Sequence, residues 1–330
     1  MTDTRGMLRA SLWPFSLAFG AVAWLRGRAY DAGWLRAERL GVRVVAVGNL
    51  GVGGNGKTPL VAWLVARALQ LGRRPGVLAR GYGREPGATL NDEGRLLARR
   101  FPGLPQEQAP DRVAAGRRLL ARHTVDVLFL DDGFQHRRLA RDLDLVCLDA
   151  ERPFAQGRLL PAGDLREPPS ALTRADAVVM TRAGALDEAT RRQRIATIHG
   201  HARRELPVWF AEHAPLDVES SSDRRCEPVA TLRGREVVLL SSIARPAAFE
   251  ATVVGLGARV LAHHARRDHH RHDPAAVEAL ARDARRRGAG LLTTEKDAVK
   301  LDAVVEPYLV LRIGLRFLGA EPEPSLVGLS

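Results

Sequence analysis

The chain is poor in the residue types that build disulfide scaffolds and nucleic-acid stacking surfaces. Only two cysteines, Cys147 and Cys226, occur among its 330 residues, and they lie far apart in the sequence. Such sparse cysteine excludes a disulfide framework or a cysteine metal motif and favours a reducing compartment. Aromatic residues make up 5% of the chain, and its arginines are not interleaved with them. This pattern argues against a basic nucleic-acid-binding protein.

Lysine is scarcer still. The chain has 50 lysines and arginines, of which only Lys57, Lys296 and Lys300 are lysine and the other 47 are arginine. The bias suggests that arginine serves wherever any cation will do. The three lysines then mark sites that need a compact ammonium rather than a planar guanidinium. The net charge of +12 favours an anionic partner, although arginine-rich usage by itself also raises this figure.

No uncharged run near the start of the chain is long enough to span a bilayer comfortably. Residues 10–25 carry no charge and are flanked by arginines, but a spanning helix needs about 20 residues. We therefore expect a helix that lies in the membrane interface. The rings of Trp13, Trp24 and Trp34 would lie at the level of the lipid headgroups, and the arginines would contact anionic headgroups. A buried first helix is the alternative.

The rest of the sequence alternates apolar runs with helical segments. Continuous apolar runs separated by helices indicate an α/β fold with a doubly wound, mostly parallel sheet. A polar stretch over residues 217–225 is expected to be a surface connection to a second, smaller α/β unit. The expected division is therefore a membrane-associated segment, a nucleotide-binding domain and a smaller domain, over residues 1–40, 41–225 and 226–330.

A phosphate-binding loop is the strongest motif. Residues 51–58 fit the pattern G-x-x-x-x-G-K-[ST] and lie between a predicted strand and a predicted helix, as in P-loop NTPases. The loop residues expected to surround the phosphates of ATP are Gly51, Gly53, Gly54, Asn55 and Gly56. Lys57 can reach the β- and γ-phosphates, and the Thr58 hydroxyl can bind Mg²⁺. A glycine-rich turn without a ligand is the alternative.

Two further groups of residues suit phosphoryl transfer. Asp131 and Asp132 follow an apolar strand, where a carboxylate can hold Mg²⁺ directly or through water. Arg166 lies in a proline-rich loop and could bind the γ-phosphate in the transition state. A surface loop explains Arg166 equally well.

Asp92 and a histidine-rich stretch are weaker candidates. A kinase that acts on an alcohol needs a group that accepts the hydroxyl proton, and Asp92 could serve, although its position also suits a helix cap. Residues 263–272 contain five histidines. No cysteine or carboxylate pattern completes a zinc site there, so Asp268 and His269 as an acid–base pair, or a solvated basic loop, remain. Residues 294–297 lack the spacing of a guanine-reading motif.

Together these segments resemble the tetraacyldisaccharide 4'-kinase family, the lipid A 4'-kinases of Gram-negative bacteria. The matching segments follow the family's order over residues 10 to 300. They are Val47-Gly48-Asn49-Leu50, Gly53-Gly54-Asn55-Gly56-Lys57-Thr58-Pro59, Arg80-Gly81-Tyr82-Gly83, Asp92-Glu93, Asp131-Asp132-Gly133-Phe134-Gln135-His136, Leu160-Pro161-Ala162-Gly163 with Leu165-Arg166-Glu167, Ser242-Ile243-Ala244-Arg245-Pro246, Asp268-His269-His270 and Thr294-Glu295-Lys296-Asp297.

The resemblance implies transfer of the γ-phosphoryl group of ATP, with Mg²⁺, to the 4'-hydroxyl of a tetraacylated glucosamine disaccharide 1-phosphate, giving lipid IVA. It implies a peripheral or monotopic enzyme on the cytoplasmic face of the anionic inner membrane, with no nucleic acid and no obligate protein partner. It makes Asp92 the base, supported by His269, and Arg166 the residue that steadies the transferring group. Glu93 and Tyr82 are then expected to touch the nucleotide.

The chain departs from the family pattern in two places. Ser241-Ser242 replaces an expected serine-glycine, and Gly94 replaces a proline after Glu93. Neither change removes a proposed catalytic side chain. The main rival is another phosphate-loop NTPase, such as a metallochaperone-type GTPase or an ATPase that moves a partner, which hydrolyses nucleotide without a lipid acceptor.

Overall fold

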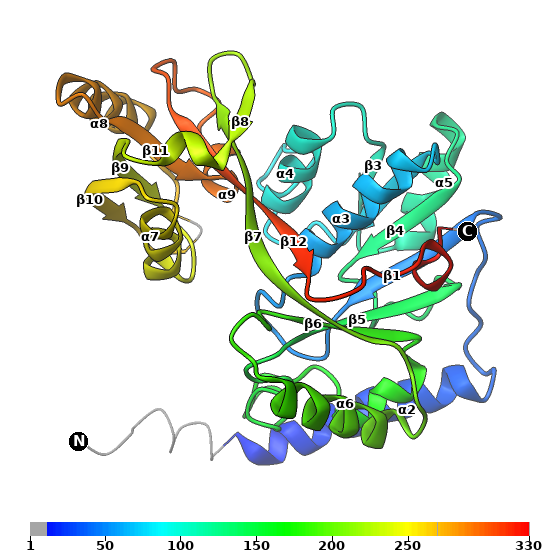
Figure 1. Ribbon diagram of the computed structural model, residues 1–330. Coiled ribbons are helices and arrows are strands. Elements are labelled where there is room, and N and C mark those ends of the chain that lie inside the picture. Colours follow the sequence, from blue (N-terminus) through cyan, green and yellow to red (C-terminus); the bar gives the residue numbers. More distant parts are fainter. Residues whose placement is uncertain (1–11, 269, 330) are drawn as a thin grey trace. The chain divides into compact units, whose positions relative to one another are not determined.

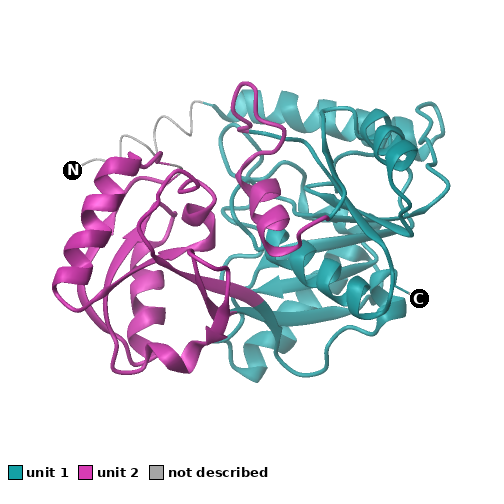
Figure 2. Cartoon of the chain, turned by 90° about the horizontal axis from the view of Figure 1, so that it is seen from above, with its two compact units in different colours: residues 1–82, 104–213, 315–330 teal, residues 83–103, 214–314 magenta. Residues whose placement is uncertain are grey.

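The computed structural model describes residues 12–268 and 270–329, which divide into two compact units (Figure 2). The first unit consists of the described residues of Met1–Tyr82, Leu104–His213 and Leu315–Ser330. The second consists of Gly83–Gly103 and Ala214–Gly314. The expected boundary near residue 225 therefore differs from this division, chiefly because the second unit takes in residues 83–103 from the middle of the expected first domain.

Ion pairs explain why residues 83–103 belong to the second unit. Helix α4 (Asp92–Arg100) presents Arg99 to the buried carboxylate of Glu219 at 2.6 Å, and Arg100 pairs with Glu295. The Arg100 side chain also donates to the carbonyl of Ile313 at 2.7 Å. These long-range partners are far from α4 in the sequence, so no local pattern could assign the helix to its unit.

The first unit is built on a parallel sheet with strand order β7-β6-β5-β1-β4-β2-β3 (Figure 1). Each strand in this order pairs with its neighbour in the parallel sense. Its strands are β1 (Arg43–Gly48), β2 (Pro75–Ala79), β3 (Gln106–Gln108), β4 (Val127–Asp131), β5 (Leu143–Asp149), β6 (Ala177–Thr181) and the first part of β7 (Val208–Ser220). The parallel α/β fold expected from the apolar runs is confirmed.

Helices and loops bury both faces of this sheet. Val44 and Ala46 join a core cluster with Leu119 of α5, while the alternate residues Val45 and Val47 are also fully buried. Because successive strand residues point to opposite faces, their shared burial means that both faces are covered. The helices of this unit are α2 (Trp13–Asp31), α3 (Lys57–Gln70), α5 (Arg112–Arg122), α6 (Glu188–Ala202) and the 3-10 helices η1 (Pro169–Arg174) and η3 (Pro324–Val327).

The second unit contains a smaller sheet with strand order β10-β9-β11-β12-β7. Strands β9, β10, β11 and β12 pair in parallel, and β8 pairs with β7 in the antiparallel sense. Its elements are β8 (Cys226–Pro228), β9 (Glu236–Ser241), β10 (Arg259–Ala265), β11 (Gly290–Thr294), β12 (Leu309–Phe317), α4, α7 (Pro246–Gly255), α8 (Pro274–Arg286), α9 (Glu295–Ala298) and η2 (Val229–Leu232). Strands β7 and β12 run from one unit into the other.

The polar stretch at residues 217–225 does not connect the two units, because it lies within the second unit, where only the turn over residues 222–225 is exposed. Asp217 to Ser220 complete β7, and a turn leads into β8. Asp217 forms an ion pair with Arg312 at 2.5 Å, and Glu219 is 2% exposed. Arginine partners neutralise these carboxylates, so a charged segment can lie inside a folded unit.

Candidate active site

The phosphate-binding loop leaves β1 through two fully buried residues, Asn49 and Leu50, and enters α3 at Lys57. Gly53 and Gly56 have φ angles of +110° and +82°. These backbone conformations are costly for residues with a Cβ. At Gly56 a Cβ would also lie 2.8 Å from the Thr181 side chain. The glycines therefore allow the tight loop that places backbone N–H groups around an anion at the start of a helix.

Three neighbouring segments hold this loop. The Val52 N–H donates to the carbonyl of Asp164 at 2.7 Å, and the Thr181 hydroxyl donates to the carbonyl of Asn55 at 3.0 Å. The Arg182 guanidinium donates to the carbonyl of Gly54 and pairs with Asp149 at the end of β5. The loop is thus fixed from the carboxyl ends of β5 and β6, where ligands of parallel sheets bind.

Lys57, Asp132 and Arg166 form one charged group beside the loop. The Lys57 ammonium lies 3.5 Å from Asp132, and the Arg166 guanidinium donates to the other oxygen of the same carboxylate at 2.7 Å. The backbone N–H of Arg166 donates to the carbonyl of Leu50 at 2.7 Å, which ties its loop to the start of the phosphate-binding loop. Three side chains predicted from separate motifs therefore meet in the first unit.

Asp132 is held ionised by its neighbours. Burial raises the pKa of this carboxyl, but the positive charges of Lys57 and Arg166 more than offset this and leave its pKa below the ordinary value. Asp132 also has a φ angle of +57°, an uncommon conformation for a residue other than glycine. Strained backbone of this kind is often found at functional sites.

Thr58 and Asp131 supply oxygen atoms suited to Mg²⁺. The Thr58 hydroxyl donates to the Asp131 carboxylate at 3.2 Å, and Asp131 is 7% exposed at the end of β4. Among residues 12–268 and 270–329, no group of three or more histidine, cysteine, aspartate or glutamate side chains could hold a metal ion. Mg²⁺ in kinases commonly has one or two protein ligands and completes its shell with phosphates and water. The Thr58–Asp131 pair fits this need.

Asp92 is the first residue of α4 in the second unit. The helix cap is the preceding residue, Asn91, whose side chain accepts a hydrogen bond from the Gly94 N–H at 3.0 Å. The capping role that could have explained Asp92 therefore belongs to its neighbour. The Asp92 carboxylate lies 3.7 Å from the ammonium of Lys300.

The other predicted residues are placed as follows. His269 lies outside the described residues, and its neighbour Asp268 forms an ion pair with Lys296 at 2.8 Å in the second unit. Glu93 follows Asp92 in α4. Tyr82 belongs to the first unit and is 84% exposed. Its side chain is accessible, as contact with a nucleotide requires.

Two histidines of residues 263–272 have structural partners. His263 shares hydrogen bonds with the Ser241 hydroxyl and the Glu250 carboxylate, each at 2.8 Å. His272 contacts the Asp297 carboxylate at 3.2 Å. The Ser241-Ser242 departure also has a role, because the Ser242 N–H and hydroxyl both donate to Asp297.

Sequence reasoning missed several residues that the site uses. Arg182 follows β6 without any motif, yet it links Asp149 to the phosphate-binding loop. Arg112, the first residue of α5, is almost fully buried. Burial and then the positive charge of Arg80 lower the pKa of its guanidinium, whereas the negative charges of Asp132 and Asp131 raise it. Asp297 ends a segment that was noted for its match to the family but given no role, and Lys300 follows it by three residues. The scarcity of lysine was the one signal that pointed to Lys300.

Comparison with known proteins adds an independent observation. The family model described as Tetraacyldisaccharide-1-P 4'-kinase matches residues 8–325. The chain is 44% identical over 302 residues to Tetraacyldisaccharide 4'-kinase of Anaeromyxobacter dehalogenans (strain 2CP-C), which covers 86% of this chain and 79% of the relative. It is 38% identical over 329 residues to the protein of the same name from Syntrophus aciditrophicus (strain SB), covering 92% and 87%.

A solved structure is similar over nearly the whole length. The crystal structure of the "apo" form of LpxK from Aquifex aeolicus in complex with ATP has a TM-score of 0.78 and 30% sequence identity. The alignment covers 98% of each chain. The similarity therefore includes both units.

Proposed function

The chain belongs to the Tetraacyldisaccharide-1-P 4'-kinase family, and from this premise we propose how its residues carry out the reaction. It is an ATP-dependent kinase of lipid A biosynthesis that phosphorylates the 4'-hydroxyl of tetraacyldisaccharide 1-phosphate and gives lipid IVA. The observation that carries this proposal within the chain is the convergence of Lys57, Asp132 and Arg166 beside the phosphate-binding loop.

The first unit provides the charges that phosphoryl transfer needs. Such a reaction depends mostly on positioning and on stabilising the negative charge of the transferring group. Loop N–H groups and Lys57 would bind the phosphates of ATP. Thr58 and Asp131 would hold Mg²⁺, which neutralises charge on the β- and γ-phosphates, and Asp132 keeps Lys57 and Arg166 in place. Arg166 would then stabilise the γ-phosphoryl group.

The second unit would supply the group that accepts the proton of the sugar hydroxyl. Asp92 is a candidate because its carboxylate is not the helix cap and lies beside an ammonium. His269 is proposed to support Asp92, and Glu93 and Tyr82 are proposed to contact the nucleotide. The hydroxyl proton goes to Asp92 as the sugar oxygen bonds to phosphorus and ADP leaves.

The direct test measures transfer of labelled γ-phosphate from ATP to tetraacyldisaccharide 1-phosphate in mixed micelles. We expect labelled product that is bisphosphorylated and no transfer when the acceptor lacks a free 4'-hydroxyl. Steady hydrolysis of ATP or GTP without a labelled lipid would overturn the kinase assignment and favour an NTPase that acts on another partner. Omission of Mg²⁺ serves as the control for uncatalysed transfer.

We also propose that α2 docks this kinase on the cytoplasmic face of the inner membrane, where the lipid substrate lies. Ser16 is the one buried residue of α2, and its hydroxyl bridges the carbonyl of Leu159 and the N–H of Ala162 at 3.0 and 2.9 Å. The remaining surface of the helix is largely apolar and accessible. The exposed apolar residues are Trp13, Phe15, Leu17, Phe19, Val22, Trp24 and Leu25.

The chemistry of this surface suits an anionic lipid interface. Arg26, Arg28 and Arg36 are exposed at or near the end of α2, where they can meet lipid phosphates while the aromatic rings enter the headgroup region. In the part of the chain that the structure describes, no helix combines the length and apolarity needed to cross a membrane.

Replacing Trp13 and Trp24 together with serine should weaken binding to anionic phospholipid vesicles by at least about tenfold. Burying a large apolar side chain contributes roughly 1.5–3 kcal/mol, and about 1.4 kcal/mol corresponds to tenfold in affinity. Vesicle flotation measures the effect. The control is Val305→Ser, which changes an apolar residue of the second unit that is even more exposed than the two tryptophans. Unchanged flotation of the double variant would rule out α2 as the docking surface.

A further inference from the structure

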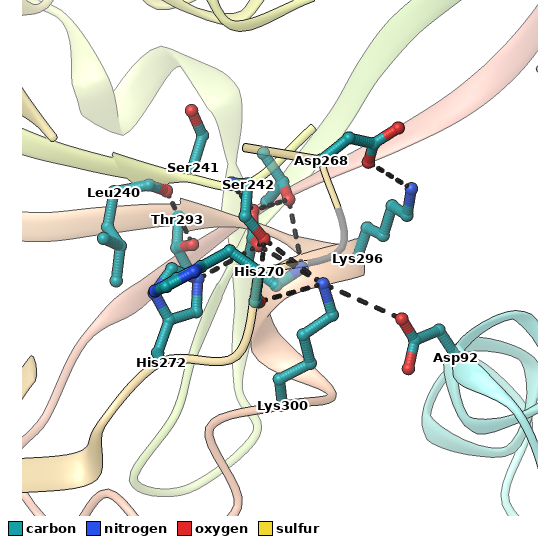
Figure 3. A network of polar contacts seen from close by, with 12 residues as sticks. Asp92, Leu240, Ser241, Ser242, Asp268, His270, His272, Thr293, Lys296 and Lys300 are labelled. Atoms are coloured by element: carbon teal, nitrogen blue, oxygen red, sulfur yellow. Dashed lines mark hydrogen bonds and ion pairs between the residues drawn. The ribbon is translucent and has the colours of Figure 1, made fainter. Parts of the chain in front are cut away.

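The three lysines of this arginine-rich chain all contact carboxylates. Lys57 lies 3.5 Å from Asp132 in the first unit. In the second unit, Lys296 lies 2.8 Å from Asp268, and Lys300 lies 3.7 Å from Asp92 (Figure 3). With 47 arginines elsewhere in the chain, these positions are ones where a planar guanidinium does not replace a compact ammonium. Lys300 is not part of the phosphate-binding loop, so that motif gives no reason for a lysine at this position.

A buried carboxylate anchors the position of Lys300. Asp297 is 0% exposed and accepts hydrogen bonds from the Thr294 hydroxyl at 2.7 Å and from the Ser242 N–H at 2.9 Å. Burial raises the pKa of Asp297, but hydrogen bonds from His272, Ser242 and Thr294 more than offset this and leave its pKa lowered. An ionised carboxylate is therefore fixed inside the second unit by groups from three separate segments.

Lys300 lies between this anchor and Asp92. Its ammonium is 3.9 Å from Asp297 and donates to the Ser242 hydroxyl at 3.2 Å and to the carbonyl of His270 at 3.5 Å. Only 8% of its side chain is exposed. Ser242 and Asp92 lie on different sides of the ammonium (Figure 3), an arrangement that suits its three tetrahedral donors better than the planar fork of a guanidinium.

We propose that Lys300 is a positioning residue for Asp92, in which the buried Asp297 fixes the ammonium and the ammonium fixes the carboxylate that accepts the sugar proton. The inference rests on the proposed function of Asp92. It adds two residues, Lys300 and Asp297, that act on the reaction only through another side chain. Asp92 begins the nine-residue helix α4 with its side chain 21% exposed, and the Lys300 ammonium beside it favours one orientation of the carboxylate.

The first test replaces Lys300 with methionine, which keeps the length of the side chain and removes its charge. We expect kcat for phosphoryl transfer to fall about 10- to 100-fold, because a misplaced base costs up to about a hundredfold. The KM values for ATP and for the lipid should stay within about twofold. A large rise in the KM for the lipid with kcat unchanged would overturn the proposal, since Lys300 would then bind the substrate itself.

A double-mutant cycle with Asp92→Asn separates this role from a structural one. If Lys300 acts through Asp92, Lys300→Met should have almost no further effect on kcat in the Asp92→Asn background. Independent losses that multiply in the double variant would overturn the proposal. If Asp92→Asn alone retains full kcat, the function proposed for Asp92 fails, a result distinct from failure of the Lys300 inference.

Two further variants serve as controls in the same assay. Lys300→Arg keeps the charge but places a planar guanidinium where the site is formed around an ammonium, so it should recover little of the activity that Lys300→Met loses; full activity of the arginine variant would contradict the need for a compact ammonium. Arg95→Met removes a cation of α4 itself, whose guanidinium pairs with Asp302. It should leave kcat within about twofold of the wild-type value.

Discussion

Replacing Lys57 with methionine is expected to lower kcat for phosphoryl transfer by about a thousandfold. Loss of one preorganised donor to developing charge costs about 10²- to 10³-fold, and Lys57 is also one of two cations that hold Asp132. Its ammonium, 13% exposed, contacts the loop carbonyl of Gly53 at 3.4 Å and Asp132 at 3.5 Å. Removing the charge therefore affects both the phosphates and the acidic side chain beside them.

The measurement compares labelled phosphate transfer with the dissociation constant for ATP. Binding should weaken less than kcat falls, because the loop N–H groups still surround the phosphates. Lys57→Arg is the charge-retaining control and should recover little, since a guanidinium does not fit a site formed around an ammonium. Transfer by the methionine variant at more than a tenth of the wild-type rate would show that Lys57 does not act on the transferring group.

Replacing Asp92 with asparagine should lower kcat by about 10²- to 10⁴-fold, the usual contribution of general base catalysis. The amide is similar in size but does not accept the hydroxyl proton. The cap of α4 should survive, because Asn91 provides it. Affinity for ATP should therefore change little, and thermal unfolding should report an intact protein.

Asp302→Asn is the matched control for this prediction. Asp302 also pairs with a cation in the second unit, Arg95 of α4, at 2.5 Å. Its loss should leave kcat within about twofold, since exposed ion pairs contribute little. An Asp92→Asn enzyme as active as the Asp302→Asn enzyme would assign the base to another residue and leave the kinase function intact.

Local sequence patterns were enough to predict several parts of this protein. The apolar runs and the glycine-rich loop predicted β1, the loop and α3 in their observed order, because backbone conformation and burial follow from neighbouring residues. Lys57, Thr58, Asp131 and Asp132 were found in the same way. Arg166 was a weaker candidate because its loop has no periodic pattern, and the resemblance to a family strengthened it.

The unit to which distant residues belong, and the ion pairs they form, followed from the folded chain and not from local pattern. Residues 83–103 belong with the second unit because Arg99 and Arg100 pair with Glu219 and Glu295, more than a hundred residues away. The contact of Lys300 with Asp92 and Asp297 likewise joins a turn after α9 to the start of α4. Electrostatic pairing acts through space, so sequence spacing carries no record of it. The scarcity of lysine could mark Lys300 as unusual, but its carboxylate partners could be identified only in the folded chain.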